Sequence, residues 1–199
     1  METLPGNQKS VKRLVIFASG AGSNAQQIIN YFRNSPLAKV VLILCNKPDA
    51  GVISIAEKES IPVLLIGKER FFKGDGYLPE LRDLETDLII LAGFLWKIPQ
   101  VLIDAFPKRI INIHPALLPK YGGKGMYGRY VHETILNAGE MESGITIHYV
   151  DEHYDNGDII FQTACPVLET DNPETLAARI HQLEHLHYPV VIEELLQKL

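Results

Sequence analysis

Short apolar runs alternate with amphipathic segments along the first half of the chain. The runs rich in β-branched and other apolar residues cover 11–18, 40–45, 61–66 and 87–91. The segments with apolar residues at helical spacing cover 25–33, 51–60, 77–85 and 99–106. Such apolar runs are typical of strands in a buried sheet, and their alternation with helices predicts that the strands are parallel.

The second half of the chain changes character, because its last strands follow one another closely. The predicted elements there are a strand at 110–114, a helix at 129–138, and strands at 144–150 and 158–162. The last two strands are joined by a short turn, so we expect them to pair antiparallel. A final helical region starts near Asp171, and Pro189 is expected to kink or divide it. The predicted fold is α/β and Rossmann-like: a mostly parallel sheet flanked by helices, with an antiparallel edge near its C-terminal part.

Composition limits the size and the partners of the protein. The chain of 199 residues is 46% hydrophobic and 22% charged, which fits one globular domain at 11–199 after a flexible tail at 1–10. The net charge is −5 without a basic block, so we expect no nucleic-acid partner. The apolar runs are too short for a membrane span and no secretory leader is evident, so we expect a cytoplasmic protein with no membrane partner. Cys45 and Cys165 lie in apolar strands, which favours two buried free thiols.

A glycine-containing loop, Ser19-Gly20-Ala21-Gly22-Ser23-Asn24, joins the first strand to the first helix. Backbone amides at a helix start bind anions, so Gly22, Ser23 and Asn24 are the predicted donors to a phosphate. An NAD-binding module is an alternative, but its fingerprint requires an acid at the end of the second strand. Asn46-Lys47-Pro48 stands there instead. A phosphate monoester is therefore the preferred ligand, and a purely structural turn is the third interpretation.

Two polar side chains share one face at the end of the predicted strand at 110–114. Side chains alternate across a strand, so Asn112 and His114 point the same way while the isoleucines beside them point the other way. Pro115 cannot donate to a strand ladder, so the strand is expected to end there and deliver both side chains to a sheet edge. Open α/β sheets bind ligands at that edge. The alternative is that both side chains only satisfy neighbouring loop backbone.

A cluster of large apolar residues, Phe94, Leu95 and Trp96, follows the predicted strand at 87–91. Exposure of these side chains at a strand end is unfavourable unless a flat, apolar group covers them. The loop is therefore a candidate wall for an aromatic ligand, with core packing as the alternative for each residue.

The acidic turn that ends at Asp155 supplies a third polar group. A histidine beside a carboxylate keeps its proton to higher pH, and an imidazolium beside a neutral amide stabilises an oxyanion. No serine or cysteine stands in the context of a nucleophile. This combination predicts acyl transfer in which the attacking group belongs to the substrate.

From residue 11 onward the chain resembles the phosphoribosylglycinamide formyltransferase family of purine synthesis. The motifs that carry the resemblance are 19–24, Leu91-Ala92-Gly93-Phe94, Asn112-Ile113-His114-Pro115, Leu117-Leu118-Pro119 and 144–157. The resemblance implies transfer of a formyl group from 10-formyltetrahydrofolate, as co-substrate, to the amine of glycinamide ribonucleotide. It implies two small-molecule partners, no metal, and a monomer or homodimer.

The resemblance also implies a role for individual residues. His114 is the implied general acid and oxyanion partner, Asn112 donates to the same oxygen, and Asp155 raises the pKa of His114 and helps to move the amine proton. The implied contacts to the phosphoribosyl substrate are Gly22, Ser23, Asn24, Gly93, Pro115 and Glu184. The implied folate contacts are Leu91, Leu95, Trp96, Lys97, Ile98, Asn112, Val150, Asp151 and Lys73. Trp96 stands where many relatives have arginine, so Lys97 or stacking on the indole is expected to replace that contact.

Rival functions come from other classes. A formyltetrahydrofolate hydrolase uses the same three groups with water as nucleophile, but carries a regulatory domain for which we expect no room. Methionyl-tRNA formyltransferase needs an RNA-binding domain and a basic surface. Metal binding is a further alternative, through His148 with His153 or through His181, His185 and His187. Helical spacing places only His181 and His185 on one face, so we expect no metal site.

Overall fold

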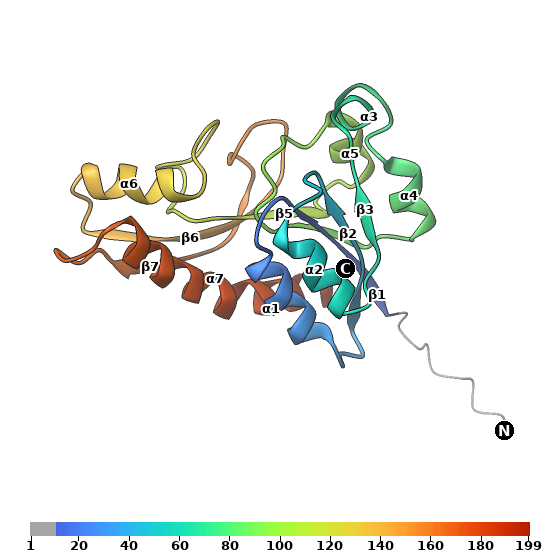
Figure 1. Cartoon of the computed structure of the whole chain (residues 1–199), viewed down its shortest axis with the longest axis horizontal. Coiled ribbons are helices and arrows are strands. Elements are labelled where there is room, and N and C mark those ends of the chain that lie inside the picture. The colour runs from blue at the N-terminus through green and yellow to red at the C-terminus, as the bar shows by residue number, and fades with distance from the viewer. Residues whose placement is uncertain (1–10) are drawn as a thin grey trace.

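The computed structural model describes residues 11–199, where one mixed sheet is flanked by helices (Figure 1). The strands are β1 (Lys12–Ala18), β2 (Ala38–Cys45), β3 (Val63–Leu65), β4 (Leu88–Leu91), β5 (Ile110–His114), β6 (Glu142–Tyr149) and β7 (Ile159–Pro166). The helices are α1 (Ser23–Phe32), α2 (Gly51–Lys58), α3 (Lys68–Lys73), α4 (Leu78–Asp83), α5 (Gln100–Ala105), α6 (Arg129–Asn137) and α7 (Pro173–Leu196). The tail expected at 1–10 lies outside the described residues.

The sheet order is β3-β2-β1-β4-β5-β6-β7. The strands from β3 to β5 are parallel to their neighbours, whereas β6 pairs antiparallel with both β5 and β7. The predicted fold class is therefore confirmed. The extra feature is that the antiparallel part begins at β5, the strand that carries Asn112 and His114.

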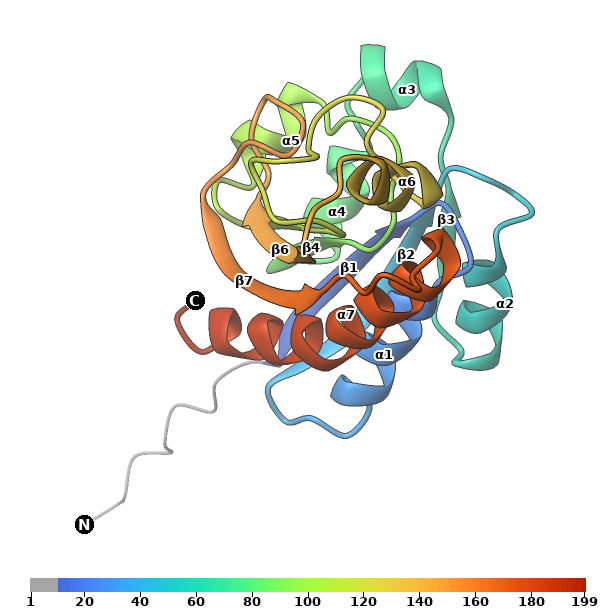
Figure 2. The ribbon, with the colours of Figure 1, turned by 90° about the vertical axis from the view of Figure 1, so that its left-hand side faces the viewer.

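Alternation along the buried strands produces two apolar cores, one on each face of the sheet. From β1, Leu14 and Ile16 pack with residues of α1, α2 and α7, whereas Val15 and Phe17 pack with residues of α3, α4 and α5. Figure 2 shows α1 and α7 on one side of the strands and α4 and α5 on the other. Strands buried on both faces read as continuous apolar runs, which is why β1, β2 and β4 are recognisable in the sequence.

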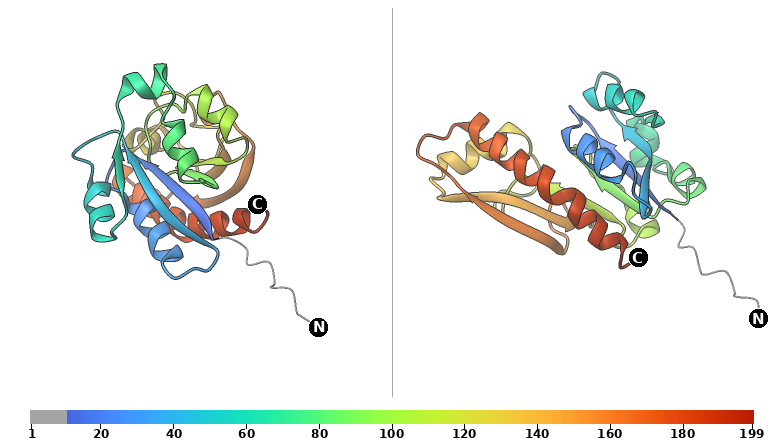
Figure 3. Two further views of the ribbon diagram at one scale, coloured as in Figure 1. Left: turned by 90° about the vertical axis from the view of Figure 1, so that its right-hand side faces the viewer. Right: turned by 90° about the horizontal axis from the view of Figure 1, so that it is seen from below.

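The antiparallel part of the sheet projects from the parallel part. Figure 3 shows β6, β7 and α6 forming this projection, and α7 runs along it and on beneath β1. Helix α7 contacts α6, α1 and β6. It therefore ties the two parts of the sheet together and carries residues from one to the other.

Three local features add to or narrow the sequence predictions. Helix α3 was not expected, because its short polar sequence shows no clear period; burial of Phe71 in the core anchors it. Strand β3 is only Val63–Leu65, shorter than the predicted run. Helix α7 is not divided at Pro189, because buried residues on both sides of the proline hold one continuous helix against the sheet. In α3 and α7, tertiary packing overrides local propensity.

Two further expectations concern cysteines and membranes. Cys45 and Cys165 are both free and buried, as predicted. Within 11–199, every helix is too short or too polar to cross a bilayer.

Candidate active site

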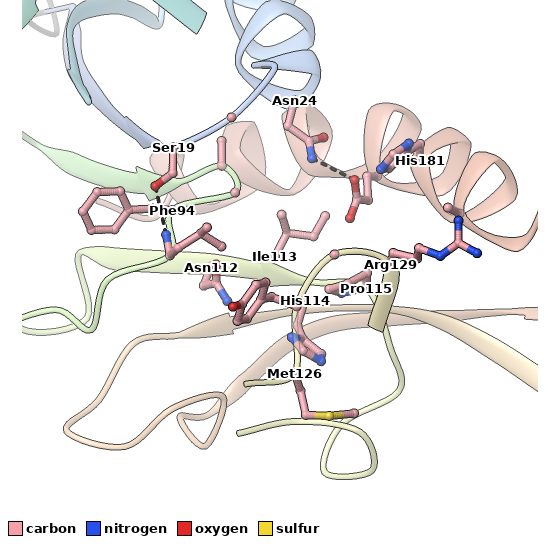
Figure 4. A pocket seen from close by; sticks show the side chains of 18 of the residues that line it. Ser19, Asn24, Phe94, Asn112, Ile113, His114, Pro115, Met126, Arg129 and His181 are labelled. Atoms are coloured by element: carbon pink, nitrogen blue, oxygen red, sulfur yellow. Dashed lines mark hydrogen bonds between the residues drawn. The ribbon is translucent and has the colours of Figure 1, made fainter. Parts of the chain in front are cut away.

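The end of β5 places two polar side chains in a cavity of about 800 Å³. Asn112 and His114 line this cavity, and His114 is only 3% exposed. Their neighbours Ile111 and Ile113 pack into the apolar core, as the alternation predicts. Figure 4 shows Asn112 and His114 on one side of the cavity, with Asn24 and His181 on the other. The cavity lies at the carboxyl ends of β1, β4 and β5, the position at which open α/β sheets bind ligands.

Asp155 reaches the same place from the turn between β6 and β7. Its Oδ2 lies 3.5 Å from Nδ1 of His114, and its Oδ1 accepts a long hydrogen bond of 3.4 Å from Nδ2 of Asn112. The backbone amide of Gly123 donates to Oδ2 at 2.9 Å. Asp155 has a φ of +52°, a left-handed conformation that aspartate tolerates better than most residues. The amide, the imidazole and the carboxylate named from the sequence therefore meet in one cavity.

Burial moves the pKa values of His114 and Asp155 in opposite directions, because it disfavours the charged form of each. Burial lowers the pKa of His114, and the carboxylate of Asp155 and the carbonyl of Tyr121 offset only part of that shift. Asp155 thus raises the pKa of His114, as expected, but the net effect of the site on this pKa is downward. Burial alone would raise the pKa of Asp155, but the neighbouring imidazoles of His148 and His114 and the hydrogen bond from the Gly123 amide bring it below its usual range. Asp155 is therefore ionised at neutral pH.

His148 is a buried neighbour of this group that sequence reasoning considered only as a metal ligand. It stands opposite Asn112 in the register of β5 and β6. Its Nε2 lies 3.1 Å from Nδ2 of Asn112 and 3.7 Å from Oδ1 of Asp155, and its Nδ1 lies 2.8 Å from the carbonyl of Tyr149. A carbonyl only accepts, so Nδ1 carries a proton and Nε2 is free to accept from Asn112. His148 thus holds the Asn112 amide in place.

The loop after β1 has the geometry expected of an anion site. Gly22 precedes α1 with a φ of +84°, and a Cβ there would lie 2.8 Å from Cβ of Val52, so only glycine fits. The first backbone bond of the helix runs from Gln26 to Gly22. The amides of Ser23 and Asn24 precede that bond, so they point out of the helix start, where they attract negative charge.

Glu184 of α7 faces this loop across the cavity. It is 5% exposed, and its Oε2 accepts a hydrogen bond of 2.8 Å from Nδ2 of Asn24. Burial raises the pKa of Glu184, and the hydrogen bond from Asn24 offsets part of that shift. Asn24 donates only to Oε2, so Oε1 of this buried carboxyl can accept a hydrogen bond from a hydroxyl group of a ligand.

The expected substrate contacts and the expected folate contacts differ in their positions. Gly22, Ser23, Asn24, Gly93, Pro115 and Glu184 all line the cavity, and so does Leu95 of the folate set. Leu91 and Ile98 are buried in the core, and Trp96 packs against Phe71, Phe72 and Phe94. The side chains of Leu91, Trp96 and Ile98 therefore pack in the core, which for Trp96 was the alternative interpretation.

The remaining predicted folate contacts lie outside the cavity. Lys97 is exposed, whereas Val150 packs against the apolar core. Asp151 accepts hydrogen bonds from the amide of His153 and the side chain of Asn156, which close the turn. Lys73 lines a separate, shallow hollow at α3. These residues can reach a ligand only where it extends beyond the cavity.

The histidines considered for a metal have other surroundings. His148 is directed at Asn112 and Asp155, whereas His153 is exposed. His181 and His185 stack with their ring planes 11° apart. In the described part of the chain, no three histidine, cysteine or acidic side chains form a group that could hold a metal ion.

His132 of α6 is a second buried histidine that the sequence did not single out. It lines the cavity, is 3% exposed, and its Nδ1 has no hydrogen-bond partner among the described residues. Burial, with a smaller contribution from the nearby rings of His181 and His114, lowers its pKa to about 4. Its position on an apolar helix face gives no local signal that it lines the cavity, because such a position is typical of ordinary core residues.

His132 leads to a prediction about stability. The unfolded chain takes up a proton at this side chain near pH 6.5, whereas the folded chain does so only near pH 4, so stability falls as the pH falls between these values. From pH 7.5 to pH 5 this histidine alone is expected to cost about 2 kcal/mol of unfolding free energy. Urea denaturation of the wild type and of His132→Phe at both pH values measures the difference. An equal loss of stability in the variant would contradict the assignment.

The chain is similar to known proteins along most of its length. The model of the formyl transferase family matches residues 12–192. A chloroplastic phosphoribosylglycinamide formyltransferase from Arabidopsis thaliana is 44% identical over 187 residues, covering 91% of this chain and 64% of that protein. The phosphoribosylglycinamide formyltransferase of Bacillus subtilis is 39% identical over 191 residues, covering 94% and 95%. The crystal structure of glycinamide ribonucleotide transformylase 1 from Symbiobacterium toebii matches with a TM-score of 0.88 at 31% identity, covering 99% and 92%. The chain thus spans less than two thirds of the plant protein but most of the bacterial ones.

Proposed function

The chain belongs to the formyl transferase family, and we propose that it transfers the formyl group of 10-formyltetrahydrofolate to the amine of glycinamide ribonucleotide. The observation that carries this proposal is the convergence of Asn112, His114 and Asp155 in one cavity with the start of α1. An oxyanion-stabilising group and a phosphate-type site thus lie within reach of one substrate. The names of the relatives in Arabidopsis and Bacillus support the same reaction.

In the proposed reaction the substrate amine attacks the formyl carbon. A new carbon–nitrogen bond forms, and the carbonyl electrons move to the oxygen. Asn112 and the protonated Nδ1 of His114 stabilise the resulting oxyanion by donating hydrogen bonds to it. The bond between the formyl carbon and N10 of the folate then breaks, N10 gains a proton, and the amine loses one.

The resting geometry indicates which protein contacts the substrate replaces. Both amide hydrogens of Asn112 are directed at protein groups, one at His148 and one at Asp155. The bond to Asp155 is long at 3.4 Å, so we propose that it is exchanged for the formyl oxygen. Asp155, released from the amide and ionised, accepts the amine proton, directly or through one water.

The two substrates are proposed to occupy different parts of the cavity. The phosphate binds the amides at the start of α1, and the ribose hydroxyls donate to Glu184 across from Asn24. The pterin lies against Leu95, the backbone after β4 and the turn that holds Asp155. The tail of the folate then extends toward Trp96 and Lys97, where the chain is partly or fully exposed.

A hydrolase with water as nucleophile is disfavoured by the anion site. Such an enzyme has no use for a phosphate subsite in the same cavity as the reacting carbonyl. The NAD alternative is disfavoured too, because Lys47 rather than an acid lines the cavity at the end of β2. We further propose that the protein acts in the cytoplasm on these small molecules, as a monomer or homodimer and without nucleic acid, membrane or metal.

The direct test is to supply both substrates to the purified protein. Formylated glycinamide ribonucleotide and tetrahydrofolate are expected in equal amounts by mass spectrometry. NADH is expected to leave the melting temperature unchanged in a thermal-shift titration. Stabilisation by NADH without formyl transfer would support the dinucleotide alternative instead.

A second prediction concerns the phosphate. The dephosphorylated analogue of glycinamide ribonucleotide is expected to bind at least about 10²-fold more weakly, because it leaves several amides at the start of α1 without a charged acceptor. Isothermal titration calorimetry of both compounds measures the ratio. Comparable affinities would show that the loop at residues 19–24 does not bind phosphate.

A further inference from the structure

The second ring nitrogen of His114 is held by the backbone of a residue outside the predicted site. Nε2 of His114 lies 2.7 Å from the carbonyl oxygen of Tyr121. Because a carbonyl oxygen only accepts, this contact requires a proton on Nε2. The other nitrogen, Nδ1, faces Oδ2 of Asp155 at 3.5 Å. It is therefore the nitrogen that gains and loses a proton.

The backbone at Tyr121 is in an unfavourable conformation. Its φ is +57°, in the left-handed region that a bulky aromatic residue rarely adopts. Strain of this kind persists only where the surroundings fix it, and it gathers at functional sites. Here it turns the carbonyl of Tyr121 back toward His114, seven residues earlier in the chain.

The side chain of Tyr121 supplies the anchor that fixes this conformation. Its hydroxyl donates to Oε1 of Glu140 at 2.8 Å, and Nζ of Lys120 donates to the same oxygen at 2.9 Å. Glu140 lies in the connection between α6 and β6. The hydrogen bonds of Glu140 to Lys120 and Tyr121 lower its pKa, so the anchor is charged at neutral pH. The hydrogen bonds to Glu140 thus connect the segment at Lys120 and Tyr121 to the start of β6.

We propose that Tyr121 and Glu140 are positioning residues for formyl transfer: together they hold His114 with a proton on Nε2 and with Nδ1 directed at Asp155. This proposal rests on the proposed function, and neither residue touches the reacting atoms. A ring with the opposite tautomer would place a lone pair against the Tyr121 carbonyl and would present no titrating nitrogen to Asp155.

The other charged or titratable neighbours of the ring do not take over this task. Asp155 faces Nδ1, and His148 lies beyond Asp155, near enough to lower the pKa of His114. His132 lies on α6 and also lines the cavity, and the ring of His114 lowers its pKa. Among the described residues, the Tyr121 carbonyl is the group that hydrogen-bonds to Nε2.

The chain contains a matched control for the anchor. Tyr31 of α1 donates to Oε2 of Glu193 at 2.7 Å, far from the cavity. Hydrogen bonding to the carboxylate raises the pKa of the tyrosine in both pairs. Tyr121→Phe and Tyr31→Phe therefore remove the same interaction at two places, only one of which holds His114.

The experiment compares the two variants in formyl transfer and in the ring tautomer. Tyr121→Phe is expected to lower kcat about 10-fold with KM for both substrates changed less than about 3-fold, because small misplacements of a reacting group are costly. The alkaline limb of its pH profile of kcat should move to lower pH, since the hydrogen bond to the Tyr121 carbonyl favours the protonated ring of His114. Tyr31→Phe should match the wild type, and Glu140→Ala should behave like Tyr121→Phe if the pair acts as one unit.

Nitrogen-15 NMR of the histidine rings gives a readout that does not depend on activity. In the wild type above the pKa of His114, the Nε2–H tautomer is expected to dominate, and Tyr121→Phe should produce a mixture. A dominant Nδ1–H tautomer in the wild type would overturn the proposal, even if no formyl transfer were detected. A Tyr121→Phe variant with the kcat, pH profile and tautomer of Tyr31→Phe would overturn it as well.

Discussion

Replacement of His114 by alanine is expected to lower kcat by about 10²–10⁴-fold, the usual contribution of a positioned acid. The ring is buried at the end of β5, with its two nitrogens directed at Tyr121 and Asp155. In the proposed reaction it supplies the donor that meets the charge developing on the formyl oxygen. Alanine leaves that oxygen to Asn112 alone, so most of the electrostatic stabilisation is lost.

Steady-state kinetics and thermal unfolding together measure this effect. The variant is expected to keep most of its stability, so that the loss appears in kcat rather than in the amount of folded protein. His153→Ala is a suitable control, because His153 is an exposed histidine in the turn between β6 and β7. This variant is expected to retain activity within about 2-fold. A His114→Ala variant with nearly normal turnover would refute the assignment of His114.

Replacement of Asp155 by asparagine is expected to lower kcat by a similar factor, about 10²–10⁴. The amide keeps the size of the side chain but removes both the charge beside His114 and the acceptor for the amine proton. The carboxylate raises the pKa of His114 against the larger effect of burial. Without it that pKa falls further, so less of the ring is protonated at a given pH and the alkaline limb of the pH profile moves to lower pH.

The pH dependence of kcat in Asp155→Asn and in a neighbouring variant tests this direction. Asp158→Asn changes an exposed carboxylate three residues away, which pairs with Lys108 at 3.4 Å. Its kcat and pH profile should match those of the wild type. A shift of the Asp155→Asn limb to higher pH would contradict the proposed coupling between the carboxylate and His114.

Local sequence patterns account for much of the fold and for part of the site. The alternation in β5 predicts that Asn112 and His114 share a face, and the apolar run in β1 predicts a strand buried on both sides. These features depend on neighbouring residues and on simple periodicity. The glycine at position 22 is recognisable from its neighbours too, because few residues other than glycine fit a tight turn before a helix.

Features that depend on distant contacts could not be predicted. His148 joins the site because β6 pairs with β5 in one particular register, and a single strand does not reveal its partner. Tyr121 acts through its carbonyl, which carries no sequence signal. The net lowering of the pKa of His114 could not be predicted either, because burial, which a sequence does not show, outweighs the nearby carboxylate.

Competition between two acceptors is the most direct measurement of the central claim, that the cavity delivers a formyl group to a substrate amine. The protein is incubated with 10-formyltetrahydrofolate in water, with and without glycinamide ribonucleotide, and formate and formylated product are both quantified. The account predicts that tetrahydrofolate appears only when the ribonucleotide is present and in equal amount to formylated product. Formate release at the same rate without the ribonucleotide would contradict it.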